Sequence, residues 1–319
     1  MKIIILDRLT LGEDLDISYL YKIGEVVSYD TTTPDCVEER IKDADVIFVN
    51  KLKLNEENLK DAKNLKLICE AATGYDNIDI DYCKKRGIAV CNVPGYSVYS
   101  VSQITVAMAL YLCNHISEYT RYVKDGTYIN SSSANILTPV YNELYSKTWG
   151  IIGYGAIGKR VGEIAKALGC NIICYKRKKE EGVKCVDLDT LLSESDIISV
   201  HIPLTEETKN LISKEKIKLL KKNAIFIITA RGAVVDEEAI CLALKEGKIA
   251  GLGCDVYSKE PLPKNSPYVE IKDYDNVCLT PHMAWGAKEA RERCFDIMIK
   301  NMNAFFNGEI LNRVDIVLH

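Results

Sequence analysis

Three side chains with complementary chemistry occur late in the chain, each shortly after an apolar run that is typical of a buried strand. They are Arg231, Glu260 and His282. An arginine can hold a carboxylate at two points, and a histidine titrates near neutral pH and can act as a general acid. A glutamate beside the histidine can orient the imidazole and favour its charged form. Each residue alone is more often a surface charge or a loop residue, but the ordered set predicts a site that binds a carboxylate and exchanges a proton.

A glycine-rich turn precedes these residues. Residues 153–158 have the pattern GxGxxG, which follows an apolar run and opens an apolar helical pattern. Gly153 permits the tight turn, Gly155 lets the backbone approach a pyrophosphate, and Gly158 lets the helix pack closely on the strand. A turn without a ligand is the alternative, but the flanking strand and helix favour a dinucleotide site whose anion meets the helix N-terminus. The expected contacts are Gly153, Gly155, Ala156, Ile157 and Gly158.

The next expected strand, residues 171–175, ends in a run of cations. An NAD site usually carries an acid there that binds the ribose hydroxyls. Here Tyr175 is followed by Lys176, Arg177, Lys178 and Lys179, with no acid before Glu180. Cations suit a 2′-phosphate, so the run favours NADPH over NADH, although a solvated basic turn is the alternative.

Apolar runs alternate with helical patterns along both halves of the chain, which predicts an α/β protein with two doubly wound parallel-sheet domains. The expected domains are residues 1–99 with 288–319, for the substrate, and residues 100–287, for the dinucleotide. A long helix over about 100–122 is expected to bridge them, residues 130–135 form a polar loop, and a last helix over about 287–307 packs back on the first domain. The expected strands are 3–6, 26–27, 46–49, 65–69, 88–90, 148–153, 171–175, 197–200, 224–229, 249–254 and 277–279.

The composition excludes several other classes of protein. A chain of 319 residues exceeds the size of one hydrophobic core, and a net charge of −4 gives no pull toward nucleic acid or anionic membrane. The first apolar run has four residues, too short for a signal peptide or a membrane span, so the cytosol is expected. Twelve cysteines without CxxC spacing are expected to be buried thiols in a reducing compartment rather than ligands of a metal.

The chain resembles the D-isomer-specific 2-hydroxyacid dehydrogenase family over essentially its whole length. The late motifs are Ala-Arg-Gly-Ala-Val-Val-Asp-Glu at 230–237, Asp-Val-Tyr-Ser-Lys-Glu-Pro at 255–261 and Thr-Pro-His-Met-Ala-Trp at 280–285. Earlier matches are Ala-Thr-Gly-Tyr-Asp-Asn-Ile-Asp at 72–79, Asn-Val-Pro-Gly-Tyr at 92–96, and His-Ile-Pro-Leu-Thr at 201–205 with Thr208.

The resemblance implies a Rossmann dinucleotide-binding domain, a homodimer and reduction of a small 2-keto acid by NAD(P)H. It implies that Arg231 holds the substrate carboxylate and that His282, paired with Glu260, is the general acid. It places the substrate near Lys51, Thr73, Gly74 and Tyr75. Further implied cofactor contacts are Thr105, Tyr175, Lys176, Arg177, His201, Pro203, Thr208, Ala230 and Asp255.

Within the family, Asn50-Lys51 and the run at 284–286 favour hydroxypyruvate or glyoxylate as substrate. Two alternatives share the fold. A formate dehydrogenase relative usually has Gln at the position of Glu260, so the carboxylate argues against it. A nucleotide-sensing corepressor would need a partner-binding surface or extensions, and the sequence indicates neither.

Overall fold

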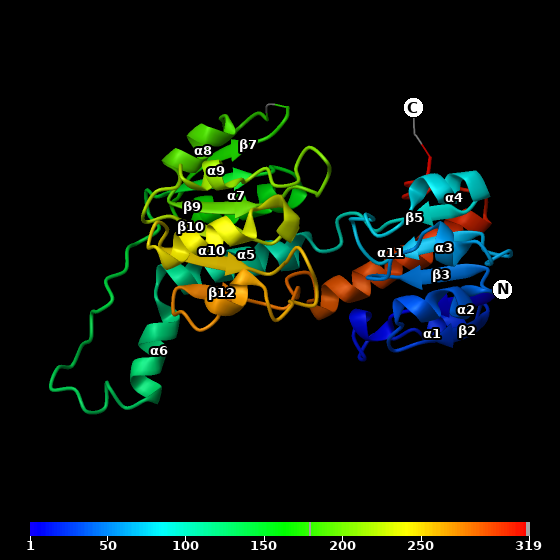
Figure 1. The fold of residues 1–319 in the computed structure, drawn as a ribbon, viewed down its shortest axis with the longest axis horizontal. Coiled ribbons are helices and arrows are strands. Elements are labelled where there is room, and N and C mark those ends of the chain that lie inside the picture. Colours follow the sequence, from blue (N-terminus) through cyan, green and yellow to red (C-terminus); the bar gives the residue numbers. More distant parts are fainter. Residues whose placement is uncertain (179, 317–319) are drawn as a thin grey trace. The chain divides into compact units, whose positions relative to one another are not determined.

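Two sheets of parallel strands organise residues 1–178 and 180–316, which are the residues that the computed structural model describes (Figure 1). Each sheet belongs to its own compact unit: residues 1–97 with 286–316 form unit 1, and Val98–Trp285 form unit 2. The prediction of an α/β protein with two doubly wound parallel sheets is confirmed. Lys179, the last cation of the basic run, lies outside the described residues.

Unit 1 has a sheet of five strands in the order β2-β1-β3-β4-β5. The strands are runs of Ile, Val and Leu, and both faces of β3 and β4 are fully buried because helices cover the sheet. The strands are β1 (Lys2–Ile5), β2 (Glu25–Ser28), β3 (Val46–Val49), β4 (Leu67–Glu70) and β5 (Ala89–Cys91). The helices are α1 (Ser18–Tyr21), α2 (Val37–Ile41), α3 (Glu56–Leu59), α4 (Ile80–Arg86) and α11 (Lys288–Phe306).

The C-terminal helix α11 packs against β4 of the same unit. Its Cys294 thiol donates to the carbonyl oxygen of Ala71 at 3.4 Å, and Phe295 lies beside Phe48 of β3 with ring centroids 6.2 Å apart. Residues from both ends of the chain therefore share one core.

Unit 2 has a sheet of seven strands in the order β12-β11-β10-β9-β6-β7-β8. The chain runs outward from β6 to β8 and then returns to the other side of β6, so the order reverses between β6 and β9. Ligands of doubly wound folds bind at such a reversal, beyond the carboxyl ends of the strands. The strands are β6 (Thr148–Ile152), β7 (Asn171–Tyr175), β8 (Lys184–Cys185), β9 (Ile197–Val200), β10 (Ile225–Ile228), β11 (Gly251–Cys254) and β12 (Val277–Leu279). The helices are α5 (Val98–Cys113), α6 (Ile116–Lys124), α7 (Ala156–Ala167), α8 (Leu188–Glu194), α9 (Lys214–Ile217) and α10 (Glu237–Lys245).

The long helix predicted over residues 100–122 is wrong in one respect, because the structure divides it into α5 and α6. His115, between them, has a φ of +50°, in the left-handed region that an α-helix of L-residues cannot continue. The Asn114 side chain caps the end of α5 by donating to the carbonyl of Leu110 at 2.8 Å. The predicted buried face of α5 is confirmed at Val101, Thr105, Met108, Ala109 and Leu112.

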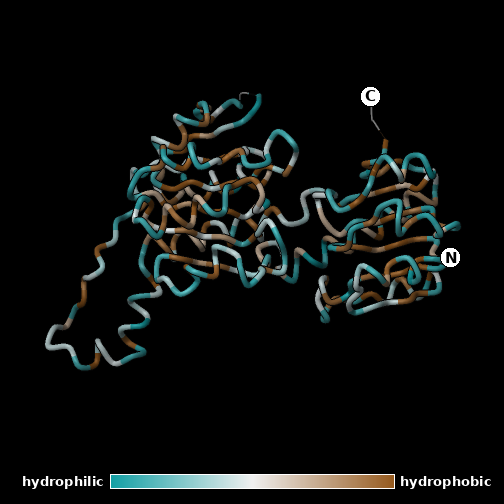
Figure 2. Tube along the Cα trace, in the orientation of Figure 1, coloured by the Kyte–Doolittle hydropathy of each residue, from teal (hydrophilic) through white to brown (hydrophobic). Residues whose placement is uncertain are grey.

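Helix α6 and the irregular segment 125–147 extend away from the sheet of unit 2 (Figure 1), and Figure 2 shows apolar stretches along this segment. The polar loop predicted at 130–135 lies within it and has no regular structure. We call residues 116–147 the arm. Within the described residues, no helix combines the length and apolar character that crossing a membrane would need.

Candidate active site

Arg231, Glu260 and His282 follow three neighbouring strands of unit 2. Arg231 comes after β10, Glu260 lies in the loop after β11, and His282 lies in the loop after β12. These strands are parallel and adjacent. Because their carboxyl ends meet at one edge of the sheet, the fold brings the three segments together although 51 residues of sequence separate the first from the last (282 − 231).

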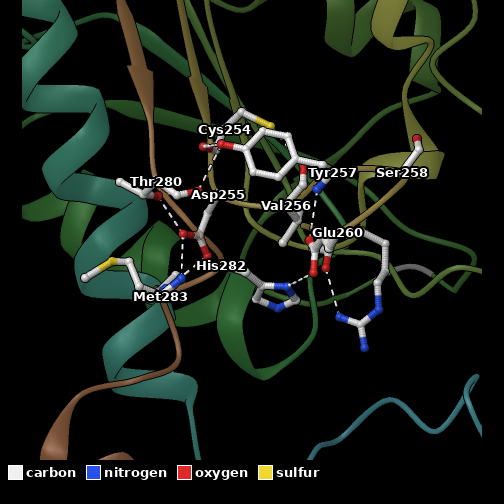
Figure 3. Close-up of polar contacts among 12 residues, drawn as sticks. Cys254, Asp255, Val256, Tyr257, Ser258, Glu260, Thr280, His282 and Met283 are labelled. Carbon is white, nitrogen blue, oxygen red and sulfur yellow. Dashed lines mark hydrogen bonds and ion pairs between the residues drawn. The ribbon is translucent and has the colours of Figure 1, made fainter. Parts of the chain in front are cut away.

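His282 and Glu260 form a direct pair (Figure 3). The imidazole Nδ1 lies 2.6 Å from Glu260 Oε2, and the two side chains are 19% and 29% exposed. The other carboxylate oxygen accepts a hydrogen bond from the backbone amide of Tyr257 at 3.0 Å, which fixes the carboxylate. With Nδ1 held by an acceptor, Nε2 is the imidazole atom that remains to exchange a proton with a substrate.

The backbone of His282 is strained. Its φ is +53°, in a region that residues other than glycine seldom adopt. Such a conformation costs on the order of 1–3 kcal/mol and occurs most often where function fixes the direction of a side chain. The strain therefore agrees with a functional role for the imidazole.

Asp255 holds the loop that carries His282. Its Oδ1 accepts from the amide of Met283 at 2.8 Å and from the hydroxyl of Thr280, and its Oδ2 accepts from the amide of Ala284 at 2.9 Å (Figure 3). Burial raises the pKa of this carboxyl, and the hydrogen bonds to Thr280, Ala284 and Met283 oppose the rise. The family resemblance implied only a cofactor contact for Asp255 and not this positioning role, because nothing in the spacing of 255 and 280–284 shows that the two loops meet.

We predict that Asp255→Asn lowers both stability and turnover. An amide nitrogen in place of one carboxylate oxygen would face a hydroxyl or amide donor, and an unsatisfied buried polar group costs about 1–3 kcal/mol. For a chain of this size the Tm should fall by about 2–4 °C per kcal/mol. Thermal unfolding and steady-state kinetics measure both effects, with Asp273→Asn, whose side chain is 83% exposed, as the matched control. A wild-type Tm and kcat in Asp255→Asn would show that the loop needs no such anchor.

The segment that carries Arg231 lies against the segment that leads to Glu260. A Cβ built at Gly232 would meet the carbonyl carbon of Tyr257 at 2.2 Å and the nitrogen of Ser258 at 2.4 Å, so only glycine permits this approach. The Tyr257 hydroxyl also donates to the carbonyl of Thr280 at 3.0 Å, which connects the second segment to the His282 loop. The guanidinium of Arg231 donates from Nη1 to the carbonyl of Ala230 at 3.0 Å.

The glycine-rich turn has the shape that a pyrophosphate requires. Gly153 has a φ of +93°, and a Cβ there would meet the carbonyl oxygen of His201 at 2.6 Å. A Cβ at Gly158 would meet the carbonyl oxygen of Gly153 at 2.2 Å, whereas one at Gly155 would meet nothing within 4 Å. Gly155 is the N-cap of α7, so the open space lies beside the free amides of Ala156 and the residues that follow it. The turn therefore fits a dinucleotide.

His201 follows β9, the strand next to β6, and supplies a second argument for a bound group. Both ring nitrogens are buried, and neither has a hydrogen-bond partner among the described residues. Burial lowers the pKa of this histidine to about 3, so the imidazole is neutral and presents one donor and one acceptor. Buried polar atoms are normally satisfied, so a ligand atom at the reversal of the strand order would be a suitable partner.

Hydrogen bonds within unit 2 hold the hydroxyls of two other predicted cofactor contacts, Thr208 and Thr105. The loop at 203–208 is held by the Thr208 hydroxyl, which donates to the carbonyl of Pro203 at 2.6 Å. Thr105 is fully buried in α5, and its hydroxyl donates to Val101 at 2.8 Å and lies 3.0 Å from the hydroxyl of Thr229, next to Ala230. Their contacts with the cofactor stay predictions.

Two cations of the basic run after β7, Lys176 and Arg177, are paired with acids. Lys176 forms a short ion pair with Glu180, and Lys159 of α7 lies 2.6 Å from the same carboxylate. Together the two lysines lower the pKa of Glu180 to about 2. Arg177 lies 3.7 Å from Glu207, with both side chains largely exposed. Sequence patterns do not reveal Lys159, because its approach to Lys176 depends on how α7 packs beside β7.

The predicted substrate residues of unit 1 lie beyond two adjacent strands. Lys51 follows β3, and its amide donates to the buried carboxylate of Asp7 at 2.7 Å. Thr73, Gly74 and Tyr75 follow β4, where the Thr73 hydroxyl donates to the carbonyl of Val93 at 2.8 Å. These hydrogen bonds shape both loops, and the role of Asp7 is not apparent from the sequence pattern.

A second buried acid, Glu70 at the end of β4, is connected to the Lys51 loop through Asn77. The side chain of Asn77 donates to Glu70 and to the carbonyl of Leu52, both at 3.0 Å. Burial raises the pKa of Glu70 well above its usual value, and the hydrogen bond from Asn77 opposes the rise. Across the part of the chain that the structure describes, no three His, Cys, Asp or Glu side chains gather closely enough to hold a metal ion.

Comparisons with known proteins agree with this geometry. Residues 106–284 match the D-isomer specific 2-hydroxyacid dehydrogenase NAD binding domain. The hydroxypyruvate reductase of Blautia hydrogenotrophica is 36% identical over 324 aligned residues, which cover 99% of this chain and 100% of the relative. The glycerate dehydrogenase of Methylorubrum extorquens is 38% identical, with 98% of this chain and 99% of the relative covered.

A solved structure leads to the same family. The D-lactate dehydrogenase of Aquifex aeolicus, complexed with NAD and lactic acid, superposes with a TM-score of 0.88 at 34% identity, and all of both chains is covered. The resemblance inferred from the sequence motifs is confirmed, as are the Rossmann domain and the expectation of NAD(P)-linked chemistry. The chain belongs to the D-isomer-specific 2-hydroxyacid dehydrogenase family, whose enzymes interconvert 2-keto and 2-hydroxy acids with a nicotinamide cofactor.

Proposed function

We propose that this enzyme reduces hydroxypyruvate to D-glycerate, or glyoxylate to glycolate, with NADPH favoured over NADH. Arg231, Glu260 and His282 carry the chemistry. The observation that supports this most strongly is the 2.6 Å contact between His282 Nδ1 and Glu260 Oε2, at the same sheet edge that carries Arg231.

Each of the three side chains has a definite task in reduction. Arg231 grips the substrate carboxylate through two parallel hydrogen bonds and polarises the neighbouring carbonyl. His282, as imidazolium, gives its Nε2 proton to the carbonyl oxygen as negative charge develops there. Glu260 keeps Nδ1 in place and balances the positive charge of the ring. Proton loss leaves His282 neutral, and a proton from water restores it for the next turnover.

The residues around the glycine-rich turn would hold the cofactor. The amides that follow Gly155 would bind the pyrophosphate, and His201 would bind a polar atom of the cofactor. NAD(P)H, when bound, supplies the hydride for the carbonyl carbon. Lys51, Thr73, Gly74 and Tyr75 of unit 1 would hold the substrate, with amides of the 73–75 loop directed at its carboxylate.

The choice of substrate is supported by the relatives named hydroxypyruvate reductase and glycerate dehydrogenase, which align with nearly the whole chain. The experiment is a panel of 2-keto acids with NADPH or NADH, followed by the loss of absorbance of the reduced cofactor. We expect hydroxypyruvate and glyoxylate to have the highest kcat/KM and hydroxypyruvate to yield the D-isomer of glycerate. Equal or higher kcat/KM with pyruvate would assign another substrate, and no oxidation of either cofactor would favour the sensor alternative.

For the cofactor, we predict that wild-type kcat/KM is at least about tenfold higher with NADPH than with NADH. Lys176→Asp should reduce or invert this ratio, because a carboxylate repels a 2′-phosphate and can accept hydrogen bonds from ribose hydroxyls. Steady-state kinetics with both cofactors measure the ratio, and Lys222→Asp, an exposed lysine before β10, is the matched control. A wild-type preference for NADH, or an unchanged ratio in Lys176→Asp, would mean that the basic run is only a solvated turn.

A homodimer and a cytosolic location are also proposed. The arm exposes large apolar side chains at Ile129, Leu137 and Val140, which are 75%, 73% and 77% exposed, and a second copy of the chain would cover such a surface. Light scattering on the purified protein should give twice the chain mass of 35.8 kDa. A monomer at micromolar concentration would contradict this. Twelve free thiols, eight of them buried, agree with a reducing compartment.

A further inference from the structure

Glu180 lies between two lysines that come from different elements of unit 2. Lys159 Nζ is 2.6 Å from Glu180 Oε1, and Lys176 binds Oε2 more closely still. The carboxylate and Lys176 are only 24% and 26% exposed, whereas Lys159 is 47% exposed. One carboxylate therefore pairs with two cations at once.

This group lies beside the turn that would bind the pyrophosphate. Lys159 belongs to the first turns of α7, directly after Gly158. Lys176 directly follows β7, and the carbonyl of its neighbour Tyr175 accepts from the amide of Gly153 at 3.0 Å. The end of this strand is where doubly wound folds bind the ribose next to the adenine, and where an acid usually decides between NAD and NADP.

We propose that Glu180 is a specificity-determining residue: a tethered anion that occupies the two-lysine site for the 2′-phosphate of NADPH and must leave it when that phosphate binds. The inference rests on the NADPH preference proposed above. It goes further because it assigns a role to Glu180, which lies beyond the strand-end position of the usual ribose-binding acid. It also adds Lys159 to the site, so the ligand class is a phosphate monoester held by Lys159 and Lys176 together.

The charges of Glu180 and the two lysines determine which cofactor Glu180 favours. The two lysines hold the pKa of Glu180 at about 2, so the carboxylate is charged at every working pH and does not leave by protonation. A 2′-phosphate carries more negative charge than the Glu180 carboxylate and has three acceptor oxygens, so it can displace the carboxylate from the lysines. The carboxylate still competes with the phosphate for both lysines. With NADH no phosphate displaces it, and Glu180 can accept hydrogen bonds from the ribose hydroxyls. Glu180 therefore weakens NADPH binding and supports NADH binding.

The test compares Glu180→Gln with Glu181→Gln, which removes the same charge from the adjacent position. Adenosine 2′,5′-bisphosphate and adenosine 5′-diphosphate serve as probes, and calorimetry at low and moderate salt measures their Kd. We expect Glu180→Gln to lower the Kd of the bisphosphate by about three- to tenfold at low salt and by a smaller factor at moderate salt. The Kd of the diphosphate should change little. The ratio of kcat/KM for NADPH over NADH should rise in parallel.

Two further variants separate this inference from the cofactor preference itself. Lys159→Gln should weaken binding of the bisphosphate. In the Lys159→Gln background, Glu180→Gln should lower the Kd of the bisphosphate by a smaller factor than in the wild type. An unchanged Kd for the bisphosphate in Glu180→Gln, or a change equal to that in Glu181→Gln, would overturn the role of Glu180 even where Lys176→Asp alters the cofactor ratio. If the wild type prefers NADH while Lys176→Asp weakens binding of the bisphosphate and Glu180→Gln tightens it, the NADPH preference fails and the role of Glu180 stands.

Discussion

Replacing His282 with alanine should lower kcat for 2-keto acid reduction by roughly 10²–10⁴-fold, the range that a positioned general acid contributes. The imidazole is held by Glu260 at 2.6 Å, and its loop is tied to Asp255 by the amides of Met283 and Ala284. Alanine keeps the loop anchors and removes the proton donor. Steady-state kinetics measure the loss, and the Kd for the reduced cofactor, followed by its fluorescence, should stay close to that of the wild type.

Glu260→Gln is the companion variant because it keeps the size of the side chain and removes its charge. Loss of a charge-assisted hydrogen bond of about 1.5–3 kcal/mol corresponds to a decrease in kcat of roughly 10- to 100-fold. The decrease should be smaller than in His282→Ala, since the imidazole remains. If His282→Ala keeps more than a tenth of the wild-type kcat, the imidazole is not the general acid. If Glu260→Gln loses nothing, the pair contributes only to structure.

Arg231→Lys should bind substrate poorly although the charge is kept. An ammonium cannot reproduce the planar two-point grip of a guanidinium on a carboxylate. Loss of one such hydrogen bond, about 1.5–3 kcal/mol, predicts a fall in kcat/KM of roughly 10- to 100-fold, mainly through a higher KM.

The matched control for this variant is Arg160→Lys on the surface of α7, where the arginine lies 2.8 Å from Glu163. It makes the same chemical change outside the site and should keep wild-type kinetics. Wild-type KM and kcat in Arg231→Lys would show that another group holds the substrate carboxylate.

The sequence was sufficient for the parts of the molecule that depend on local pattern. Apolar runs located eleven of the twelve strands that the structure describes, and the glycine spacing located the turn before α7. The exception, β8, is two residues long and contains Lys184, so it has no apolar run to detect. The order of Arg231, Glu260 and His282 at strand ends predicted their common edge because parallel strands end together.

Several features that the sequence did not predict depend on contacts between distant segments. Asp255 anchors residues of the next loop, and Lys159 reaches Glu180 across α7 and β7. In neither case does the sequence spacing of the two contacting residues match a motif that would indicate the contact. The break between α5 and α6 depends on the left-handed backbone of His115, which a helical pattern of apolar residues does not reveal.

Strand β12 has consequences for how the enzyme loses activity. It is three residues long, lies at the edge of the sheet of unit 2, and pairs only with β11 in the described structure. Short edge elements open locally at a lower free energy than the centre of a sheet. The proposed proton donor His282 is therefore attached to one of the least protected parts of unit 2, and the hydrogen bonds to Asp255 contribute to the opening free energy of that part. Mild heat or denaturant should unfold β12 and the His282 loop before the rest of the sheet unfolds. Activity should therefore disappear while most of the secondary structure persists.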